Sequence, residues 1–400
     1  MTTPDSTDGT ASDRDPHPPD YKPNIIHIAL IISDKLTGIA PLDFTPIWLV
    51  LAALACGPWG DLGWPSAVMS LAFTLADGVS LALLPKKGRS FGPVTPPLLA
   101  LTIVRTALIF GVGLFGATLP GWLLAAGLNL AILAAAVYAT WIEPFRLRIV
   151  QAELGSPKLD GQTGLRLLHA SDLHVERITA REENLLRRVG ELAPDVIVLT
   201  GDYLTLSSVH NVVAQTEARD LLDRLCDAAG PGCPIYAITG SPPVDHPDIV
   251  PSIFEGLPIT WLVDEVEELH IRGHSLRLAG MGCTAKRRLD APRLRRLLGD
   301  STAETPFTLL LYHSPDLMPE AVELGVDLYL CGHTHGGQIR LPLFGAVFTS
   351  SEFGKRYEMG RYEENGTTLY VSCGVGMEGL GAPRARFLAP PEIILWTLGS

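Results

Sequence analysis

Aspartate and histidine residues follow a series of short apolar runs in the second half of this sequence. A run such as Val196-Ile197-Val198-Leu199 is typical of a buried β-strand. The polar clusters that follow the runs are Ser171-Asp172-Leu173-His174, Gly201-Asp202, Gly240-Ser241, Tyr312-His313 and Gly332-His333-Thr334-His335-Gly336-Gly337. In open α/β sheets, ligands bind at the carboxyl ends of the strands, so we expect the clusters to meet at one site.

Carboxylates combined with imidazoles favour Mn, Fe, Zn or similar divalent ions over Ca. Asp172 and His174 are two residues apart, so both side chains can converge on one ion. Gly201 allows a close backbone turn, which lets the carboxylate of Asp202 reach between two ions. Two histidines separated by one residue can aim at two neighbouring ions. The predicted ligands of two divalent metal ions are Asp172, His174, Asp202, His313, His333 and His335.

Alternating helix and strand patterns connect the clusters and predict an α/β domain over residues 149–400. Leu185, Leu186, Val189 and Leu192 recur at helical spacing, which predicts a helix over residues 181–192. The predicted strands that end in the clusters are residues 164–171, 196–200, 234–239, 308–312 and 326–331.

The order DxH, GD, H and GHTH resembles the calcineurin-like metallophosphoesterases over about residues 164 to 400. The stretch GHTHGGQ, followed by Pro342, is similar to the membrane-anchored branch of that family. The resemblance implies a four-layer α/β/β/α sandwich that hydrolyses a phosphoester or pyrophosphate bond by attack of a metal-bridging hydroxide. It also implies that one ion is held by Asp172, His174, Asp202 and His335, and that the second is held by Asp202, His313 and His333.

The third cluster departs from the family pattern, which places Gly-Asn-His-Asp or Gly-Asn-His-Glu there. Here the sequence is GSPPVDH over residues 240–246, so the metal-binding asparagine and the phosphate-contacting histidine are missing. Ser241 is a poorer ligand. One explanation is that Asp245 and His246 supply the lost catalytic functions. A second is a weaker second metal with slower catalysis. A third is a non-catalytic membrane scaffold or sensor that binds metal without turnover.

Three apolar stretches in the first third of the chain are long enough to cross a bilayer, which takes roughly 20 residues. They are residues 66–84, 98–117 and 121–142, and the shorter apolar stretch 46–57 is a candidate fourth span. Residues 23–148 are therefore predicted to form a membrane domain with three or four transmembrane helices. Residues 1–22, rich in Pro, Asp, Ser and Thr, are predicted to be a disordered acidic tail.

Basic residues occur in two loops that two spans separate. Lys86, Lys87 and Arg89 lie between the second and third candidate spans, and Arg146 and Arg148 follow the last. Both loops should therefore lie on the same side of the membrane, and positively charged loops stay on the cytoplasmic side. This predicts a multi-pass protein of the cell membrane whose catalytic domain is cytoplasmic.

Two ionisable residues, Asp77 and Arg105, fall inside predicted spans, where an unpaired charge is costly. Each lies seven residues from the cytoplasmic end of its span, so both are about 10 Å deep at 1.5 Å per residue. We expect an intramembrane ion pair between them. The alternative is that each side chain reaches separately to the membrane surface.

Composition narrows the class of partner. A net charge of −12 argues against a nucleic-acid-binding protein. The expected partners are the membrane and a phosphorylated small-molecule or lipid substrate, and protein partners are unknown from the sequence. Six cysteines without a CxxC pair suit a reducing compartment. A basic stretch over residues 286–296 fits either a headgroup-binding surface or a solvated helix face, and glycines around Glu378 predict a tight loop near the active face.

Overall fold

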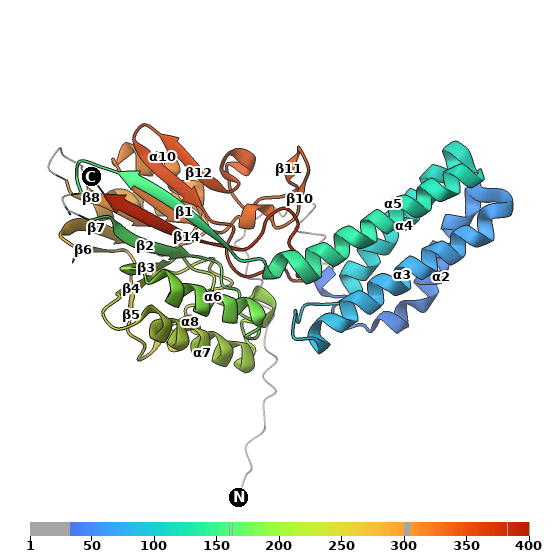
Figure 1. Cartoon of the computed structure of the whole chain (residues 1–400), viewed down its shortest axis with the longest axis horizontal. Coiled ribbons are helices and arrows are strands. Elements are labelled where there is room, and N and C mark those ends of the chain that lie inside the picture. The colour runs from blue at the N-terminus through green and yellow to red at the C-terminus, as the bar shows by residue number, and fades with distance from the viewer. Residues whose placement is uncertain (1–32, 160, 162, 300–304, 382, 400) are drawn as a thin grey trace, which may run out of the picture.

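The structure is a computed structural model that describes residues 33–159, 161, 163–299, 305–381 and 383–399. It consists of a helical domain that projects from one side of an α/β domain (Figure 1). The predicted tail, residues 1–22, and the start of the predicted membrane domain, residues 23–32, lie outside the described residues.

The helical domain is built from α2 (Thr45–Cys56), α3 (Gly63–Lys86), α4 (Thr95–Gly116) and α5 (Leu119–Val137). Within the described residues, three helical runs are long and apolar enough to cross a membrane: Pro41–Lys86, Thr95–Gly116 and Leu119–Phe145. The first run contains α2, whose 12 residues extend only about 18 Å at 1.5 Å per residue. Because that is shorter than a hydrocarbon core of about 30 Å, α2 is a short helix packed beside the long span α3.

Polarity in the helical domain is reversed relative to a water-soluble bundle. Large apolar side chains are exposed on every helix, including Leu54, Leu75, Leu114 and Leu123. Polar side chains such as Ser70, Thr74, Thr102 and Asn129 are buried instead. An apolar outer face of this extent indicates contact with lipid, because soluble monomers rarely expose large contiguous apolar surface. The three long helices therefore indicate membrane association.

The predicted ion pair inside the bundle is confirmed. Nε of Arg105 donates to Oδ2 of Asp77 at 2.7 Å, and Nη2 donates to Oδ1 at 2.9 Å. The remaining terminal nitrogen of Arg105 donates to the carbonyl of Asn129 on α5 at 2.7 Å. The pair thus joins α3, α4 and α5, and both charged side chains are fully buried.

The α/β domain contains two six-stranded sheets whose neighbouring strands are mostly parallel. The first has the order β1 (Arg148–Gly155), β14 (Glu392–Gly399), β2 (Leu165–Ala170), β3 (Val196–Leu199), β4 (Ile235–Ala237) and β5 (Ile259–Trp261). The second has the order β12 (Gly360–Glu364), β13 (Thr367–Val371), β9 (Leu328–Cys331), β8 (Phe307–Leu311), β7 (His274–Gly280) and β6 (Glu265–Ile271). The five strands predicted to precede the clusters correspond to β2, β3, β4, β8 and β9.

The two sheets pack face to face, and helices cover their outer faces. Apolar side chains of both sheets, among them Val196, Leu309 and Leu328, form one core cluster between the sheets. Helices α6 (Ala180–Leu192), α7 (Val212–Ala229) and α8 (Val250–Phe254) cover the first sheet. Helices α9 (Arg287–Leu298) and α10 (Met318–Glu323) cover the second. The predicted four-layer α/β/β/α sandwich is confirmed.

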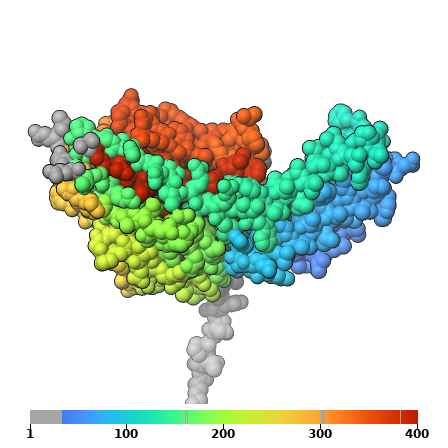
Figure 2. Space-filling model, in the orientation of Figure 1, coloured from blue at the N-terminus to red at the C-terminus, as the bar shows by residue number. Residues whose placement is uncertain are grey.

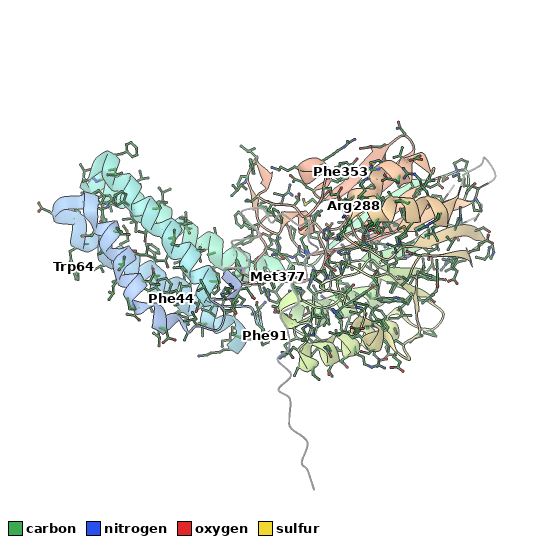
Figure 3. All side chains as sticks on the ribbon, turned by 180° about the vertical axis from the view of Figure 1, so that it is seen from behind. Phe44, Trp64, Phe91, Arg288, Phe353 and Met377 are labelled. Atoms are coloured by element: carbon green, nitrogen blue, oxygen red, sulfur yellow. The ribbon has the colours of Figure 1, made fainter. Side chains whose placement is uncertain are left out.

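Direct contacts connect the two domains. The backbone amide of Ala389 donates to the buried Glu143 carboxylate at 2.6 Å, and the amide of Arg386 donates to the carbonyl of Ala139 at 2.9 Å. The guanidinium of Arg89 lies 4.4 Å from the centre of the Phe145 ring, so the two basic loops adjoin. The space-filling view shows the helical arm continuous with the α/β domain (Figure 2). Trp64 lies near the far end of the arm and Phe91 near the junction (Figure 3).

The basic stretch forms α9, on the second sheet. Two of its arginines pair with acidic residues of the same domain: Arg287 with Glu320 at 2.8 Å, and Arg295 with Glu323 at 2.7 Å. Arg288 lies well away from the helical domain (Figure 3). These placements favour the solvated helix face over the headgroup-binding surface.

Candidate metal centre

The polar clusters come together where the carboxyl ends of the parallel strands of both sheets meet. The backbone amide of Asp172, after β2, donates to the carbonyl of Gly201, after β3, at 2.9 Å. In the second sheet, the amide of Gly332, after β9, donates to the carbonyl of His313, after β8, at 2.9 Å. These bonds hold adjacent loops side by side, so the functional groups that follow each strand face a common space.

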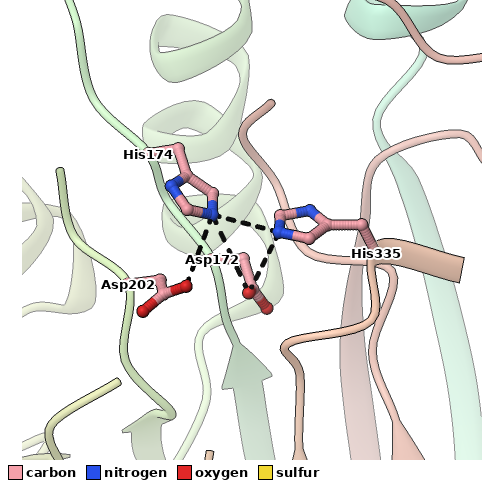
Figure 4. Close-up of side chains that lie close together, drawn as sticks. All are labelled: Asp172, His174, Asp202 and His335. Carbon is pink, nitrogen blue, oxygen red and sulfur yellow. Dashed lines mark hydrogen bonds and ion pairs between the residues drawn. The ribbon is translucent and has the colours of Figure 1, made fainter. Parts of the chain in front are cut away.

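All six side chains predicted to bind metal lie in two adjoining groups. Within each group, ligand atoms lie within 4.8 Å of one another. Asp202 belongs to both groups. Figure 4 shows the first group, in which the two imidazoles face each other above the two carboxylates. The first group is Asp172, His174, Asp202 and His335, and the second is Asp202, His313 and His333.

Donor atoms of the first group point at one small volume. Nε2 of His174 lies 3.0 Å from Nε2 of His335. Oδ1 of Asp172 lies 3.4 Å from Nε2 of His335, and Oδ2 of Asp202 lies 3.7 Å from Nε2 of His174. A buried set of two imidazole nitrogens and two carboxylate oxygens suits a divalent transition metal. The donor set therefore fits the group that the family resemblance implies.

The second group has an additional oxygen donor, the hydroxyl of Ser241. Its Oγ lies 3.2 Å from Oδ2 of Asp202 and 3.2 Å from Nε2 of His313. It also lies 3.3 Å from Nδ1 of His333. Ser241 therefore occupies the place beside the second group where the family pattern has asparagine.

Hydrogen bonds to the second ring nitrogen orient two of the histidines. Nδ1 of His174 lies 2.9 Å from both the carbonyl of Leu204 and Oε2 of Glu378. Nδ1 of His313 lies 2.7 Å from the carbonyl of Thr200. A proton held on Nδ1 by these acceptors leaves the lone pair of Nε2 free to bind metal.

Charge in the site shifts the pKa values of its groups. Burial opposes protonation of His174, but the carboxylates of Glu378, Asp202 and Asp172 outweigh it and raise the pKa of His174 to about 9. Burial likewise opposes protonation of His313, yet Asp202 and Asp172 raise the pKa of His313 to about 10. The negative charge is thus large enough to retain protons, or an equivalent positive charge, on the imidazoles.

The backbone at the site is unusual. Five of the six candidate ligands have positive φ angles: 51° at Asp172, 40° at His174, 58° at Asp202, 71° at His333 and 52° at His335. Non-glycine residues rarely adopt this region, because the side chain crowds the backbone. Such strain is found where the surrounding structure holds a functional group in place. The concentration of strained residues is a signal of function independent of residue type.

Glycines allow the loops to approach one another. A Cβ atom at Gly332 would overlap the Asp172 carboxylate, and one at Gly240 would overlap Asp202. Glycine is required at both positions because the neighbouring loop contacts the backbone directly.

The structure places neither Asp245 nor His246 in the two donor groups, and their suggested catalytic role stays a prediction. The carboxylate of Asp245 accepts hydrogen bonds from the backbone amides of Asp202, Tyr203 and Gly240 at 2.8, 2.9 and 2.6 Å. These hydrogen bonds fix the backbone of the turn that carries Asp202. His246 is 38% exposed, and its ring lies 6.0 Å from that of His210.

Sequence reasoning missed the positions of two residues in the site. Ser241 was seen as a weak substitute for asparagine, and its place beside three candidate ligands depends on the turn after β4. Glu378, 40 residues after Gln338, reaches His174 because Gln338 receives a hydrogen bond from the Glu378 amide at 2.7 Å. The glycines around Glu378 were the available sequence signal.

A cavity of about 550 Å³ opens over the two groups. Asp202, His333 and His335 line one part of it. Other walls are largely apolar and include Val244, Ile339, Val347, Phe348 and Pro383. The polar centre therefore lies in a mostly apolar cavity.

Comparison with known proteins supports the assignment. The family model for calcineurin-like phosphoesterases matches residues 165–337. The uncharacterized metallophosphoesterase YkuE of Bacillus subtilis is 29% identical over 296 residues, covering 72% of this chain and 96% of the relative. The UDP-2,3-diacylglucosamine pyrophosphatase LpxG of Chlamydia trachomatis is 26% identical, and the match covers 65% of this chain and 91% of the relative. The phosphodiesterase YaeI of Escherichia coli is 28% identical, and the match covers 65% of this chain and 92% of the relative. Residues 165–337 thus match the calcineurin-like phosphoesterase family model, and this match and the named relatives support a phosphoester hydrolase.

Proposed function

We propose that this protein is a membrane-anchored hydrolase that uses two divalent cations to cleave a phosphoester or pyrophosphate bond. The observation that carries the proposal is the sharing of Asp202 by two adjoining groups of buried donors. A carboxylate common to two sites sets the spacing of the two cations. The proposed ligands of the pair are Asp172, His174, Asp202, His313, His333 and His335.

Two cations at such a centre supply Lewis-acid stabilisation of a phosphoryl group and lower the pKa of a bound water. The chain provides orientation for that chemistry. Acceptors on the far side of His174 and His313 keep the binding nitrogens aimed at the centre. The buried turn that carries Asp202 is held by Asp245, so the shared carboxylate is rigidly placed.

The altered third motif is compatible with catalysis in this proposal. The hydroxyl of Ser241 lies within hydrogen-bonding distance of Asp202, His313 and His333, so the second cation retains an oxygen donor there. A serine hydroxyl is neutral and bonds metal more weakly than an amide oxygen. We therefore expect weaker binding of the second cation rather than its loss, which favours an enzyme over a metal-binding scaffold.

We propose that the helical domain is a multi-pass anchor in the cell membrane with the α/β domain on the cytoplasmic side. Lys86 ends α3, Lys87 and Arg89 follow it, and the guanidinium of Arg89 lies 4.4 Å from the centre of the Phe145 ring, next to Arg146 in the sequence. Basic loops at this end support a cytoplasmic position, because such loops are retained on that side.

We propose a phosphorylated or pyrophosphate-linked lipid as the substrate class. The centre lies in a mostly apolar cavity next to the membrane helices. The name of the LpxG relative describes a pyrophosphatase acting on a diacylated substrate, and that of YaeI describes a phosphodiesterase. Both chemistries suit an anchored enzyme that meets its substrate at a lipid surface.

The test is an assay of the full-length protein with Mn²⁺. Substrates are p-nitrophenyl phosphate, bis-p-nitrophenyl phosphate and a lipid pyrophosphate, and the Asp202→Asn variant is the negative control. Turnover of at least one substrate by the wild-type protein, lost in the variant, is expected. Bound metal without turnover of any of them would favour the scaffold.

A further inference from the structure

A second apolar cavity adjoins the one over the metal centre. It has a volume of about 230 Å³ and lies among the membrane helices α3, α4 and α5. Its helical walls include Leu81, Leu101 and Ala136. On the side of the α/β domain it is closed by Ile339, Pro383 and Ala385.

Ile339 and Pro383 line both cavities. The space over the metal centre and the space inside the helical bundle therefore share a wall made of these two side chains. Ile339 is 36% exposed and precedes the short hairpin β10 (Arg340–Leu341) and β11 (Gly345–Ala346). This hairpin stands beside the base of α5 (Figure 1).

The helix-side cavity reaches the surface that faces lipid. Val104 lines the cavity and is 53% exposed on α4. Asp77, whose carboxylate is neutralised by Arg105, lies at the same cavity. Because that charge is paired, an apolar chain entering from the bilayer meets a largely apolar path.

An amphiphilic substrate has two opposed requirements. Its phosphate must reach the buried polar centre, and its hydrocarbon chain must stay out of water. Adjoining cavities, one at the metal centre and one among membrane helices, satisfy both requirements at once. A small polar phosphoester would gain nothing from the apolar walls of the two cavities. The two cavities therefore favour a substrate that carries a hydrocarbon chain.

We propose that a hydrocarbon chain of the substrate passes between Ile339 and Pro383 and lies in the α3–α5 cavity while the phosphate is at the metal centre. The inference rests on the proposed function for the phosphate end. It adds a binding site for the chain and makes Ile339 a residue that determines chain specificity.

The first experiment compares chain-length dependence in the full-length protein. Methyl and dodecyl p-nitrophenyl phosphate share one leaving group, so the ratio of their kcat/KM values isolates the chain. For substrates presented as monomers in water, each methylene group that enters the cavity should raise the ratio about fourfold. Ile339→Trp narrows the passage and should lower the ratio towards one. Leu341→Trp, a nearby exposed position that lines neither cavity, is the matched control and should keep the wild-type ratio.

The second experiment measures binding without turnover. Dodecyl phosphate with a terminal diazirine is photocrosslinked to the protein in nanodiscs. We expect the probe to label Leu101 and Ala136. Excess unlabelled dodecyl phosphate should remove this labelling, and Ile339→Trp should abolish it. Labelling unaffected by the competitor and by Ile339→Trp would overturn the chain site.

The chain-length assay and the photocrosslinking experiment together distinguish the chain site from the proposed hydrolase function. Absence of turnover on all esters with competed labelling intact would reject the hydrolase and keep the chain site. Turnover with equal rates for both chain lengths would keep the hydrolase and reject the chain site.

Discussion

The hydroxyl oxygen of Ser241, which stands where the motif of the resembled family has asparagine, lies 3.2 Å from Nε2 of His313. The same oxygen is within hydrogen-bonding distance of Asp202 and His333. One atom thus contacts all the other members of the second donor group.

Substituting Ser241 by Ala should weaken binding of the second cation about tenfold, a loss typical of ligand-supporting groups. The first cation should bind as before, because its donors do not include Ser241. Titration calorimetry with Mn²⁺ resolves the two affinities. Ser252→Ala is the control, since that hydroxyl donates to the Ile249 carbonyl on the surface. An affinity for the second cation that is unchanged from wild type in Ser241→Ala would remove Ser241 from the centre.

Glu378 should act as a positioning residue for His174. Its carboxylate lies 2.9 Å from Nδ1, so Glu378→Gln keeps the shape but removes the charge that supports the imidazole. The variant should bind the first cation roughly tenfold more weakly. The pKa of His174, followed by NMR in the metal-free protein, should also fall, which a merely structural role would not produce. Glu363→Gln, on the exposed surface, serves as the control. An unchanged His174 pKa would contradict the assignment.

Metal binding should release protons at neutral pH. In the metal-free protein the pKa of His174 is raised to about 9 and that of His313 to about 10, so both imidazoles are protonated at pH 7. Because metal binds the neutral ring, saturation should release about two protons. Affinity should therefore increase with pH between 7 and 9 and decrease in acid. Calorimetry in two buffers of different ionisation enthalpy measures the release. Identical heats in both buffers would show that the rings are already neutral.

The Asp77–Arg105 pair should behave as one energetic unit. Removing either partner leaves a buried charge, so Asp77→Asn and Arg105→Ala should each cost roughly 3–5 kcal/mol of the free energy of unfolding. The double variant should cost little more than either single change. Unfolding in detergent measures the losses, and the exposed pair variant Arg187→Ala is the control. Additive losses would show that the two residues act independently.

His246→Ala should change kcat by no more than roughly twofold, as expected for a surface substitution. Its ring neighbours His210 and lies outside the cavity over the metal centre. The assay is turnover of whichever p-nitrophenyl ester the wild-type protein hydrolyses. A large loss in kcat would restore His246 to the catalytic role that the sequence first suggested.

Local sequence pattern was sufficient for the five strands that precede the clusters, the long apolar helices and the grouping of the six candidate ligands. Apolar runs followed by polar clusters are determined by burial and by the period of a strand, and these features are local. The Asp77–Arg105 pair was also predictable, because a charge in a span requires a partner and helix rise fixes its depth.

Positions that depend on turns and long-range contacts were not predictable in this way. The pattern of residues 240–246 left open whether Asp245 faces the centre, and the fold turns its carboxylate to the amides behind Asp202. Glu378 meets His174 across more than half of the α/β domain's sequence.

Sequence by itself determined which side chains can bind metal and which segments are apolar enough for a membrane, because both are properties of residue type and spacing. Tertiary structure decided that Asp202 serves two donor groups, that Ser241 completes the second, and that Ile339 and Pro383 separate the metal centre from the bundle. These relations arise from the packing of loops distant in the chain, which no local pattern contains.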